Sequence, residues 1–551
     1  MAPRPTSVTC TSLFFSWPDG TRVLDDFRLA VGPGRTGLVG LNGSGKSTLL
    51  KLIAGELVPA SGTVHVAGEV GYLPQNLVLD TGLRVDRALG IDHARAALHA
   101  IEAGDTAAAH FAAVGDDWDV EERARAVLDR LGLGHVGLDR TIGELSGGES
   151  VLLRLAALQL ARPDVLLLDE PTNNLDLFAR RRLYEAVDAW PGVLIVVSHD
   201  RELLERVDQI ADLRDGEVAW YGGGWSDYRA ALAAEQEAAE RMVRVAEADV
   251  QRQKRELSDA QAKLARRRRY AQKSAENKVL PKVVANTRRG QAEVSAGKHR
   301  QLHAERLADA RSRLDAAVEA VRDDDEIRIE LPYTAVPPGR DVLLLRDLEL
   351  RYGARVTGAF ELRGPERVAL VGRNGAGKST LLRTVAGALD PVAGEAVARV
   401  PLRFLQQRLD VLDDALSVVE NVARMAPGAT PQVIRARLAR FLFRGARADR
   451  PVGTLSGGER FRATLAALLL AEPAPQLLLL DEPTNNLDMA SVRSLTAALD
   501  AYEGALIVAA HDVPFLESLG ITRWLELDGA LRPTTAEQVR QALGGDPARP
   551  A

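Results

Sequence analysis

The chain has 551 residues, of which 46% are apolar and 26% charged, and its formal charge is −6. At roughly 100–200 residues per domain, this length excludes a single core and predicts three or four compact units. No apolar run approaches the roughly 18 residues of a membrane helix, which excludes a transporter with its own spans, and a single cysteine, Cys10, excludes a disulfide framework, an iron–sulfur domain and a multi-cysteine zinc site.

Residues 6–222 are predicted to form a first α/β domain. The start, MAPRPTSVTC, has no apolar signal core, so we expect a cytoplasmic protein. A β-branched run at residues 36–39 leads into the glycine-rich sequence GLNGSGKST at residues 40–48, and a helical pattern follows at residues 47–54. A strand, a glycine loop and a helix in this order form the context in which this motif binds nucleotide phosphates.

Two later segments of this domain predict buried parallel strands. LLLD at residues 166–169 and LIVVSHD at residues 194–200 are apolar until their carboxyl ends, where open α/β sheets bind ligands. Before them, an LSGGE motif occupies residues 145–149. Between Gln75 and this motif the chain is Ala-rich, and we expect a small helical arm at about residues 86–117.

The next segment, residues 223–330, is predicted to be a helical-hairpin linker. Apolar residues recur at helical spacing over residues 239–264 and again over residues 307–321, on either side of a polar centre that contains Pro281 and Gly290. A first arm of about 35 residues would reach roughly 50 Å. A flexible linker would instead be rich in Gly and Ser.

The linker is strongly basic in an otherwise acidic chain. Residues 241–313 hold twenty Lys or Arg and eight Asp or Glu, a formal charge of +12, which leaves −18 for the remainder. A solvated helix face is the ordinary reading of such a run. We favour a polyanionic partner, and nucleic acid over a membrane surface because the segment lacks a bulky apolar face.

The motifs of the first domain return in a second α/β domain at residues 340–530, which precedes a short tail at residues 531–551. GRNGAGKST occupies residues 372–380, LSGGE residues 455–459, and LLLDEPTNNLD recurs from residues 166–176 at residues 478–488. Because the complete set is duplicated, the sequence predicts two α/β P-loop nucleotide-binding domains joined by the hairpin.

Each glycine loop supplies backbone N–H groups for the β- and γ-phosphates, and the helix behind it adds its positive N-terminal end. A lysine contributes a point charge and a serine hydroxyl reaches Mg²⁺. The predicted loop residues are Gly40, Asn42, Gly43, Gly45, Lys46, Ser47, Thr48, Gly372, Asn374, Gly375, Gly377, Lys378, Ser379 and Thr380.

Carboxylates, amides and histidines near the strand ends complete the predicted chemistry. An aspartate at the end of each LLLD strand holds Mg²⁺ through water, and the glutamate after it acts on the attacking water as a general base. A lone histidine or glutamine is more often structural, but their register with the other motifs favours a γ-phosphate contact and a metal ligand, respectively. The predicted metal ligands are Ser47, Gln75, Asp169, Ser379, Gln407 and Asp481, and the predicted catalytic residues are Glu170, Glu482, His199 and His511.

One aromatic residue precedes each glycine loop by about 25 residues, Trp17 in the first domain and Tyr352 in the second. Core filling is the default for such a residue. We expect stacking on adenine, more firmly for Tyr352 than for Trp17.

The order of glycine loop, LSGGE, DEPTNNLD and histidine resembles ATP-binding cassette ATPases, and tandem cassettes joined by a basic hairpin resemble the ABC-F family. The resemblance covers about nine tenths of the chain. It implies ATP and Mg²⁺ as cofactors, and a nucleotide sandwiched between the glycine loop of one cassette and the LSGGE motif of the other. Carried over, the Lys46 site takes Ser456, Gly457 and Gly458, and the Lys378 site takes Ser146, Gly147 and Gly148.

The same resemblance implies that both sites hydrolyse ATP, since each keeps a glutamate. One position departs from the repeat: Leu152 stands after the first LSGGE motif where the second cassette has the basic residue Arg462. This difference is expected to weaken or retune the Lys378 site, which is completed by the first LSGGE motif.

In ABC-F proteins the linker enters the ribosomal exit site and reaches toward the peptidyl-transferase centre. By resemblance, a monomer with intramolecular cassette pairing and no membrane partner binds the 70S ribosome, with 23S rRNA and the tRNA in the peptidyl site as contacts. It then regulates translation or protects the ribosome from antibiotics, and residues 270–290 form the linker tip. The predicted RNA-binding residues are Lys254, Lys263, Arg266, Arg267, Arg268, Arg269, Lys273, Lys278, Lys282, Arg288, Arg289 and Lys298.

Two other classes share these motifs. The ATPase subunit of an importer explains the tandem cassettes but not the +12 hairpin. A DNA-repair or chromosome ATPase brings either a zinc module, which the single cysteine excludes, or very long coiled coils, which the chain length excludes.

Overall fold

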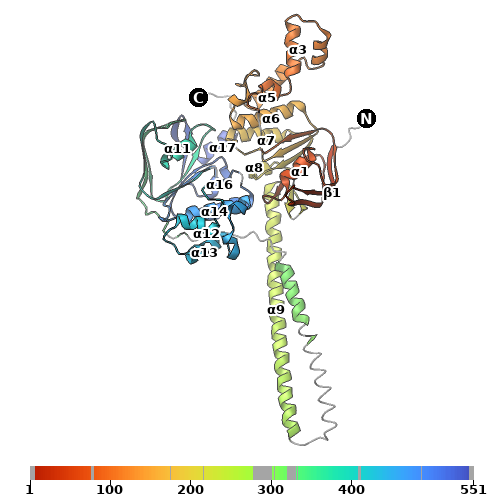
Figure 1. Cartoon of the computed structure of the whole chain (residues 1–551), viewed down its shortest axis with the longest axis vertical. Helices are drawn as coiled ribbons and strands as arrows, with labels where there is room; N and C mark the ends of the chain where they lie inside the picture. Colours follow the sequence, from red (N-terminus) through yellow and green to blue (C-terminus); the bar gives the residue numbers. More distant parts are fainter. Residues whose placement is uncertain are drawn as a thin grey trace. The chain divides into compact units, whose positions relative to one another are not determined.

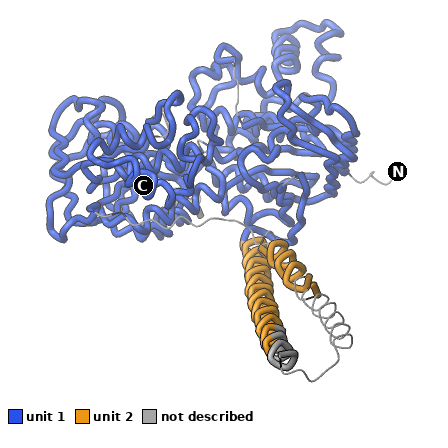
Figure 2. Tube along the Cα trace, turned by 60° about the horizontal axis from the view of Figure 1, so that its bottom comes forward, with its two compact units in different colours: residues 1–225, 325–551 blue, residues 226–324 orange. Residues whose placement is uncertain are grey.

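The computed structural model describes residues 6–75, 80–173, 175–214, 216–276, 301–302, 305–318, 331, 333–406, 411–485 and 487–544. The chain divides into two compact units, coloured separately in Figure 2. Unit 1 comprises Met1–Trp225 and Asp325–Ala551, and unit 2 comprises Ser226–Asp324. Unit 1 holds both α/β cassettes, which confirms the predicted fold class.

The first cassette is built on a six-stranded sheet in the order β5-β6-β7-β3-β8-β9. All neighbours pair in parallel except the antiparallel β8 and β9. Its strands are β3 (Gly34–Gly40), β5 (Val70–Leu73), β6 (Val165–Asp169), β7 (Val193–Val197), β8 (Gln209–Arg214) and β9 (Glu217–Gly222). Every residue of β6 and β7 is buried, as expected for apolar runs covered on both faces of a parallel sheet.

A second, three-stranded antiparallel sheet in the order β2-β1-β4 completes this cassette. Its strands are β1 (Ser7–Ser16), β2 (Arg22–Val31) and β4 (Ser61–Ala67). The helices of the cassette are α1 (Lys46–Ile53), α2 (Val85–Ala88), α3 (Asp92–Glu102), α4 (Ala108–Val114), α5 (Val120–Arg130), η1 (Ile142–Glu144), α6 (Gly147–Ala161), α7 (Leu177–Asp188) and α8 (Arg201–Leu204).

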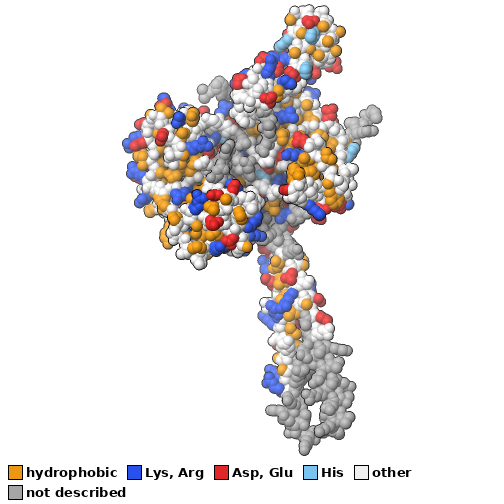
Figure 3. All heavy atoms as spheres, in the orientation of Figure 1, with side chains coloured by type: hydrophobic (Ala, Val, Ile, Leu, Met, Phe, Trp, Pro, Cys, Tyr) orange, Lys and Arg blue, Asp and Glu red, His pale blue; other side chains and the backbone are white. Residues whose placement is uncertain are grey.

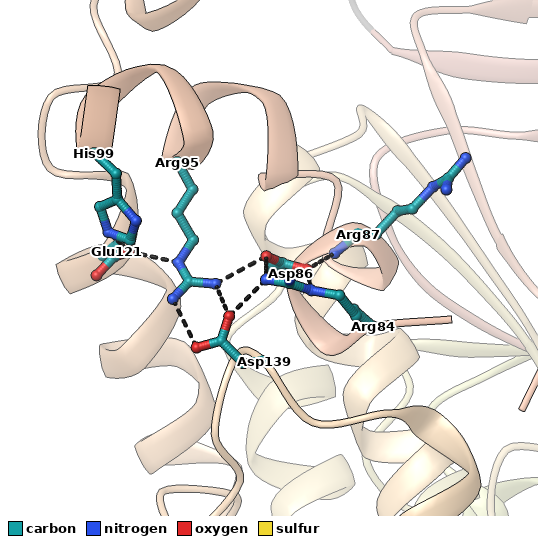
Figure 4. Close-up of polar contacts among 7 residues, drawn as sticks. All are labelled: Arg84, Asp86, Arg87, Arg95, His99, Glu121 and Asp139. Atoms are coloured by element: carbon teal, nitrogen blue, oxygen red, sulfur yellow. Dashed lines mark hydrogen bonds and ion pairs between the residues drawn. The ribbon is translucent and has the colours of Figure 1, made fainter. Parts of the chain in front are cut away.

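The Ala-rich segment after β5 forms α3 and α4, which pack against each other near the top of Figure 1. Arg95 of α3 is nearly buried and binds three carboxylates (Figure 4). Its Nε lies 2.5 Å from Glu121 Oε1, and one terminal nitrogen lies 2.8 Å from Asp86 Oδ2 and 2.7 Å from Asp139 Oδ1. This ion-pair cluster ties α3 to α2, to α5 and to the loop before η1.

The second cassette forms one nine-stranded sheet in the order β13-β10-β11-β18-β17-β12-β16-β15-β14. Its strands are β10 (Asp341–Glu349), β11 (Arg355–Arg363), β12 (Arg367–Val371), β13 (Ala393–Ala398), β14 (Leu402–Leu405), β15 (Leu477–Asp481), β16 (Ala505–Ala509), β17 (Arg523–Asp528) and β18 (Ala530–Thr534). A single parallel pairing, Arg355 with Ala530, joins the antiparallel part to the rest. The two cassettes thus share strand order in the parallel part of the sheet.

The helices of the second cassette pack on that sheet. They are α11 (Lys378–Val385), α12 (Val418–Met425), α13 (Pro431–Leu438), η2 (Ala439–Phe441), η3 (Gly445–Asp449), η4 (Val452–Thr454), α14 (Gly457–Leu469), α15 (Met489–Asp500), α16 (Val513–Ser518) and α17 (Ala536–Gly544). Phe441, Phe461 and Phe515 are fully buried in the largest apolar cluster.

Unit 2 contains α9 (Trp225–Glu276) from its second residue onward and a second helical segment at residues 305–318, and the two lie side by side in Figures 1 and 2. Val250 of α9 packs against Leu307 and Ala310, and Asp249 pairs with Arg313 at 3.5 Å. The expected first arm of about 35 residues was too short, because α9 has 52 residues and spans about 78 Å. Among the described residues, no helix combines the length and the apolarity needed to span a membrane.

Candidate active sites

Both glycine loops end a central strand and begin a helix, β3 and α1 in the first cassette and β12 and α11 in the second. Gly40 and Gly372 have φ values of 150° and 146°, and a Cβ atom on them would lie 2.4 Å from Leu213 O and 2.3 Å from Leu527 O. Only glycine fits there, because the loop passes against the neighbouring strand. The helix N-terminus behind each loop is therefore held where an anion binds.

The two loop lysines are 6% exposed and lie inside their loops. Lys46 Nζ donates to Gly40 O at 2.8 Å and to Leu41 O at 2.9 Å, and Lys378 Nζ donates to Gly372 O at 2.8 Å and to Arg373 O at 3.2 Å. Burial lowers the pKa of both lysines, while nearby carboxylates act to raise it. Each cation is thus held within the loop predicted to bind phosphate.

A hydroxyl and a carboxylate meet beside each lysine. Ser47 Oγ donates to Asp169 Oδ1 at 3.0 Å, and Ser379 Oγ donates to Asp481 Oδ1 at 3.0 Å. Burial raises the pKa of both aspartates. Within the described ranges no group of three or more His, Cys, Asp or Glu side chains could hold a metal ion. This donor set fits Mg²⁺, which binds through one or two protein oxygens together with substrate phosphates and water.

The predicted general bases stand directly after the strands, in a strained backbone conformation. Glu170 has φ 50° and Glu482 has φ 47°, a region that non-glycine residues rarely occupy. Their N–H groups donate to Val197 O and Ala509 O, each at 2.8 Å. The hydrogen bond to the neighbouring strand holds each glutamate at the edge of its sheet, and strain of this kind concentrates at active sites.

Each glutamate is paired with the predicted histidine. His199 Nε2 lies 3.2 Å from Glu170 Oε1, and His511 Nε2 lies 3.1 Å from Glu482 Oε1. Burial raises the pKa of Glu170 to about 8 and that of Glu482 to about 7. Burial lowers the pKa of His199 to about 4 and that of His511 well below its usual value. Perturbed acids and bases in contact are typical of catalytic sites.

Several buried polar atoms at these strand ends have no hydrogen-bond partner among the described residues. They include Glu482 Oε2 and the Nδ1 atoms of His199 and His511, whereas Glu170 Oε1 has only its contact with His199 Nε2. Buried polar atoms in folded proteins are nearly always satisfied. These atoms therefore fit a site that binds a triphosphate with its metal ion and attacking water.

The remaining predicted ligands differ in how far the structure describes them. Gln75 follows β5 and is exposed, whereas Gln407 lies outside the described residues. Trp17 is 37% exposed and packs edge-on against Phe15, and Tyr352 is 66% exposed. Neither aromatic ring fills the core, so stacking on adenine remains the prediction for both.

The LSGGE motifs begin α6 and α14. Ser146 and Ser456 cap these helices by accepting from the N–H groups of Glu149 and Glu459, each at 3.3 Å. A Cβ atom on Gly147 or Gly457 would meet nothing within 4 Å. Packing within the fold therefore does not require glycine there, and the space beside both glycines is open. Gly148 and Gly458 follow in the first turn of each helix.

Two aspartates that connect the cassettes were not predicted from the sequence. Asn42 N–H donates to Asp488 Oδ2 at 3.2 Å, and Asn374 N–H donates to Asp176 Oδ2 at 3.1 Å. The other oxygen of each carboxylate caps α15 and α7, respectively. Each glycine loop is thus held by the opposite cassette. The repeated LLLDEPTNNLD motif ends in these residues and contained the signal for the helix caps.

A second group that was not predicted lies on α7. Arg180 is 8% exposed and donates to Asp200 Oδ2 at 3.1 Å and to Leu175 O at 3.2 Å. Tyr184 OH donates to the same oxygen of Asp200 at 2.8 Å. These residues line a small pocket together with His511 and Asp512 of the second cassette.

The predicted RNA contacts lie on unit 2. Lys254, Lys263, Arg266 and Arg269 are exposed on α9, and Figure 3 shows Lys and Arg side chains along its described part. Most of the predicted tip lies outside the described part of the chain. The same holds for the side chains, or the whole residues, of the other predicted contacts: Arg267, Arg268, Lys273, Lys278, Lys282, Arg288, Arg289 and Lys298.

Comparisons with known proteins agree with this geometry. Residues 24–173 and 358–485 match the family described as ABC transporter. The tylosin resistance ATP-binding protein TlrC of Streptomyces fradiae is 35% identical over 90% of this chain and 92% of its own. The probable ATP-binding protein YheS of Escherichia coli K12 is 33% identical over 93% and 78%.

A mouse relative, ATP-binding cassette sub-family F member 3, is 31% identical over 93% of this chain and 70% of its own. Among solved structures, the archaeal ribosome recycling factor aABCE1, in complex with the ribosomal stalk protein aP1, aligns with a TM-score of 0.57. That alignment covers 98% of this chain and 94% of the other at 20% identity, and it shows a shared fold.

Proposed function

The chain belongs to the ABC-F family of ATPases, and from that membership we propose that it binds the ribosome when ATP closes its two cassettes. Unit 2 then contacts ribosomal RNA and the tRNA in the peptidyl site, which modulates translation or protects the ribosome from an antibiotic. Hydrolysis of ATP releases the protein. The relative named for tylosin resistance supports protection and makes tylosin the first compound to test.

The reciprocal contact between each glycine loop and the aspartate of the opposite cassette carries this proposal. Asn42 and Asn374 place their loops against Asp488 and Asp176 at 3.2 and 3.1 Å. Binding of phosphates in one loop therefore acts on the helix that begins at the aspartate of the other cassette. This is the arrangement in which a γ-phosphate switches an interface between two states.

Within each site the residues divide the chemistry. Lys46 and the N–H groups of its loop bind the phosphates, and Ser47 and Asp169 hold Mg²⁺, which neutralises charge on the phosphate oxygens when bound. Glu170 accepts a proton from the attacking water. His199, whose Nε2 lies 3.2 Å from Glu170 Oε1, contacts the γ-phosphate.

Residues of the second site take the same parts. Lys378 binds the phosphates, Ser379 and Asp481 hold the metal ion, and Glu482 and His511 act on water and on the γ-phosphate. We assign Ser456, Gly457 and Gly458 to the first nucleotide and the equivalent residues of α6, Ser146, Gly147 and Gly148, to the second.

Charge on unit 2 supports an RNA partner. Near the base of α9, Arg241 pairs with Glu237 and Arg244 with Glu240. Lys254, Lys263, Arg266 and Arg269 form no ion pair with any described residue and stay available for phosphates. Contacts of this kind give affinity with little base information, and they weaken steeply as salt rises.

The main experiment traps the closed state. The double change Glu170→Gln and Glu482→Gln should make the protein sediment with 70S ribosomes in ATP and not in ADP. A matched control adds Lys46→Ala and Lys378→Ala, which removes phosphate binding and should abolish co-sedimentation. Absence of the trapped variant from the ribosome fraction in ATP would refute the proposal.

A second experiment tests the RNA contact. Changing Lys254, Lys263, Arg266 and Arg269 to Gln should weaken ribosome binding and make it less dependent on salt, by roughly one unit of log–log slope for each phosphate that the variant no longer binds. The matched control changes Arg241 and Arg244 to Gln on the same helix and should leave the slope unchanged. Tylosin susceptibility of a sensitive host that expresses each variant then reports protection. Equal slopes for both variants would exclude this face from RNA binding.

A further inference from the structure

The helices that follow the two DEPTNNLD motifs differ in the side chains that reach across the cassette boundary. The duplicated motif fixes their alignment, in which Phe178 of α7 corresponds to Ala490 of α15, and Arg180 corresponds to Val492. Tyr184 likewise corresponds to Thr496. An aromatic ring, a cation and a phenol on α7 therefore have small or uncharged counterparts on α15.

Arg180 occupies the boundary between the cassettes. It is anchored in its own cassette through Asp200 at 3.1 Å and Leu175 O at 3.2 Å. The pocket that it lines also includes His511 and Asp512 of the second cassette. Asp512 caps α16 by accepting from Phe515 N–H at 2.9 Å. The arginine thus lies among two carboxylates, one from each cassette, beside the histidine of the Lys378 site.

Electrostatics is consistent with this placement. Burial raises the pKa of Asp512, the Asp200 carboxylate raises it further, and Arg180 acts to lower it. Removing one partner from a buried charge cluster leaves the remaining charges poorly compensated. Loss of the Arg180 cation would therefore push Asp200 and Asp512 apart, and with Asp512 it would move the adjacent His511.

Phe178 makes a second contact to the same site. The guanidinium of Arg373, which belongs to the glycine loop of the second cassette, lies 5.4 Å from the centre of the Phe178 ring. This distance is within the range of a cation–π interaction. The corresponding positions of the other site hold Leu41 and Ala490, which cannot form one.

We propose that Arg180 and Phe178 are positioning residues for the Lys378 site alone, so that the two ATP sites are unequal. Arg180 holds His511 in place through Asp512, and Phe178 holds the glycine loop through Arg373. The Lys46 site has the equivalent loop contact, Asn42 to Asp488, but Leu41 and Ala490 replace the Arg373 and Phe178 pair. The inference rests on the ATP-site assignments of the proposed function.

The inference can be tested in variants in which only one of the two sites keeps its catalytic glutamate. Glu170→Gln leaves hydrolysis to the Lys378 site, and Glu482→Gln leaves it to the Lys46 site. In the first background, Arg180→Leu should lower kcat about tenfold, because a displaced catalytic group reduces the rate strongly, with a smaller change in KM. In the second background the same change should alter kcat by less than about twofold. Arg180→Lys should recover most of the activity, because it keeps the cation.

The outcomes separate this inference from the assignments beneath it. Equal loss of kcat in both backgrounds would overturn it, since a general weakening of the fold acts on both sites. If the double variant Glu170→Gln and Glu482→Gln hydrolysed ATP at the wild-type rate, the assignment of the two glutamates would be wrong. The inference would then be overturned with it.

An exposed pair provides a test that does not depend on Arg180→Leu folding. Phe178→Ala with Arg373→Leu gives the Lys378 site the residues of the Lys46 site. It should raise the KM for ATP about threefold in the Glu170→Gln background only. The reverse transfer, Leu41→Arg with Ala490→Phe, should lower KM only in the Glu482→Gln background. No site preference in either transfer would overturn the role of Phe178.

Discussion

The two cassettes have nearly identical phosphate-binding geometry and differ around it. The lysine to loop carbonyl distance is 2.8 Å in both, and the serine to aspartate distance is 3.0 Å in both. Among the described residues, only the first cassette has helices in the positions of α3 and α4, and its α7 carries Phe178 and Arg180 where α15 carries Ala490 and Val492. The chemistry was duplicated, whereas the residues that couple each site to its surroundings diverged.

One further difference is within the sites themselves. Lys378 Nζ lies 3.0 Å from His511 Nε2, and the burial-lowered pKa of His511 is depressed further by the Lys378 and Arg180 charges. Burial and the Lys46 charge likewise lower the pKa of His199, but Asp488 acts to raise it. Each histidine is thus influenced by its loop lysine, and the sites differ in the second charge, which is Arg180 for His511 and the carboxylate of Asp488 for His199.

The largest effect should come from the glutamates, and it tests whether the sites work separately. Glu170→Gln and Glu482→Gln should each reduce hydrolysis at their own site by about 10²–10⁴-fold, the usual contribution of a general base. Because the other site keeps its geometry, each single variant should retain a measurable part of the phosphate release of the wild type. A single variant as inactive as the double variant would show that the sites hydrolyse only together.

The next effect concerns the arm that only the first cassette has. Arg95 is the shared partner of Asp86, Glu121 and Asp139, so Arg95→Met removes the cation that joins the three carboxylates and leaves only their separate contacts to Arg84 and His99. We expect a loss of about 3 kcal/mol in local stability, at the lower end for a broken buried ion pair. Amide hydrogen exchange of α3 should rise while that of the two parallel sheets stays constant. Arg125→Met, on α5, serves as the control.

The same cluster predicts a dependence on pH. Hydrogen bonds from Arg95 and Arg84 outweigh burial and lower the pKa of Asp86, Arg95 likewise outweighs burial at Glu121, and its hydrogen bonds lower the pKa of Asp139. A carboxylate with a lowered folded-state pKa stabilises the fold above its unfolded pKa and loses that contribution as pH falls. Protection of α3 should therefore be constant down to about pH 5 and decline below it. An Arg95→Met variant that declines just as steeply would contradict this origin.

The repeat allowed much of this comparison to be predicted from sequence. β6 and β7 were predicted within one to three residues, because an apolar run that ends in Asp or His reports a buried parallel strand and its ligand end. The length of α9 was not. It begins at Trp225, before the apolar stripe, with Tyr228 buried near its start, and it continues through Arg- and Ala-rich residues that favour helix without a stripe.

The contacts between cassettes could not be predicted either. Asp176 meets Asn374 across 198 residues, and Asp488 meets Asn42 across 446. The repeat shows that these residues recur, but it does not show which copy each one contacts. Arg180 gave no signal, since it lies in an Arg-rich run that is typical of an exposed helix face.

A smaller effect is expected where the two LSGGE helices differ. Leu152 is 5% exposed and belongs to the core, whereas Arg462 is half-buried. Leu152→Arg should therefore cost about 2 kcal/mol or more, because it replaces a buried side chain with a charge. Arg462→Leu should cost less than about 0.5 kcal/mol. Urea unfolding measures both. An equal loss of unfolding free energy in both variants would mean that Leu152 is not a core residue but a position at which the two LSGGE helices have simply diverged.

The smallest effect concerns the aspartates that join the cassettes. Asp176→Ala and Asp488→Ala each remove a helix cap, which costs about 1 kcal/mol, and Ser417→Ala removes a comparable cap on α12 away from both sites. All three should lower thermal stability similarly. Only the aspartate changes also release a glycine loop, so Asp176→Ala should weaken ATP binding at the Lys378 site and Asp488→Ala at the Lys46 site. Because Phe178 and Arg373 still hold the Lys378 loop, the loss should be smaller there. A larger loss at the Lys378 site would reverse the inequality inferred for the two sites.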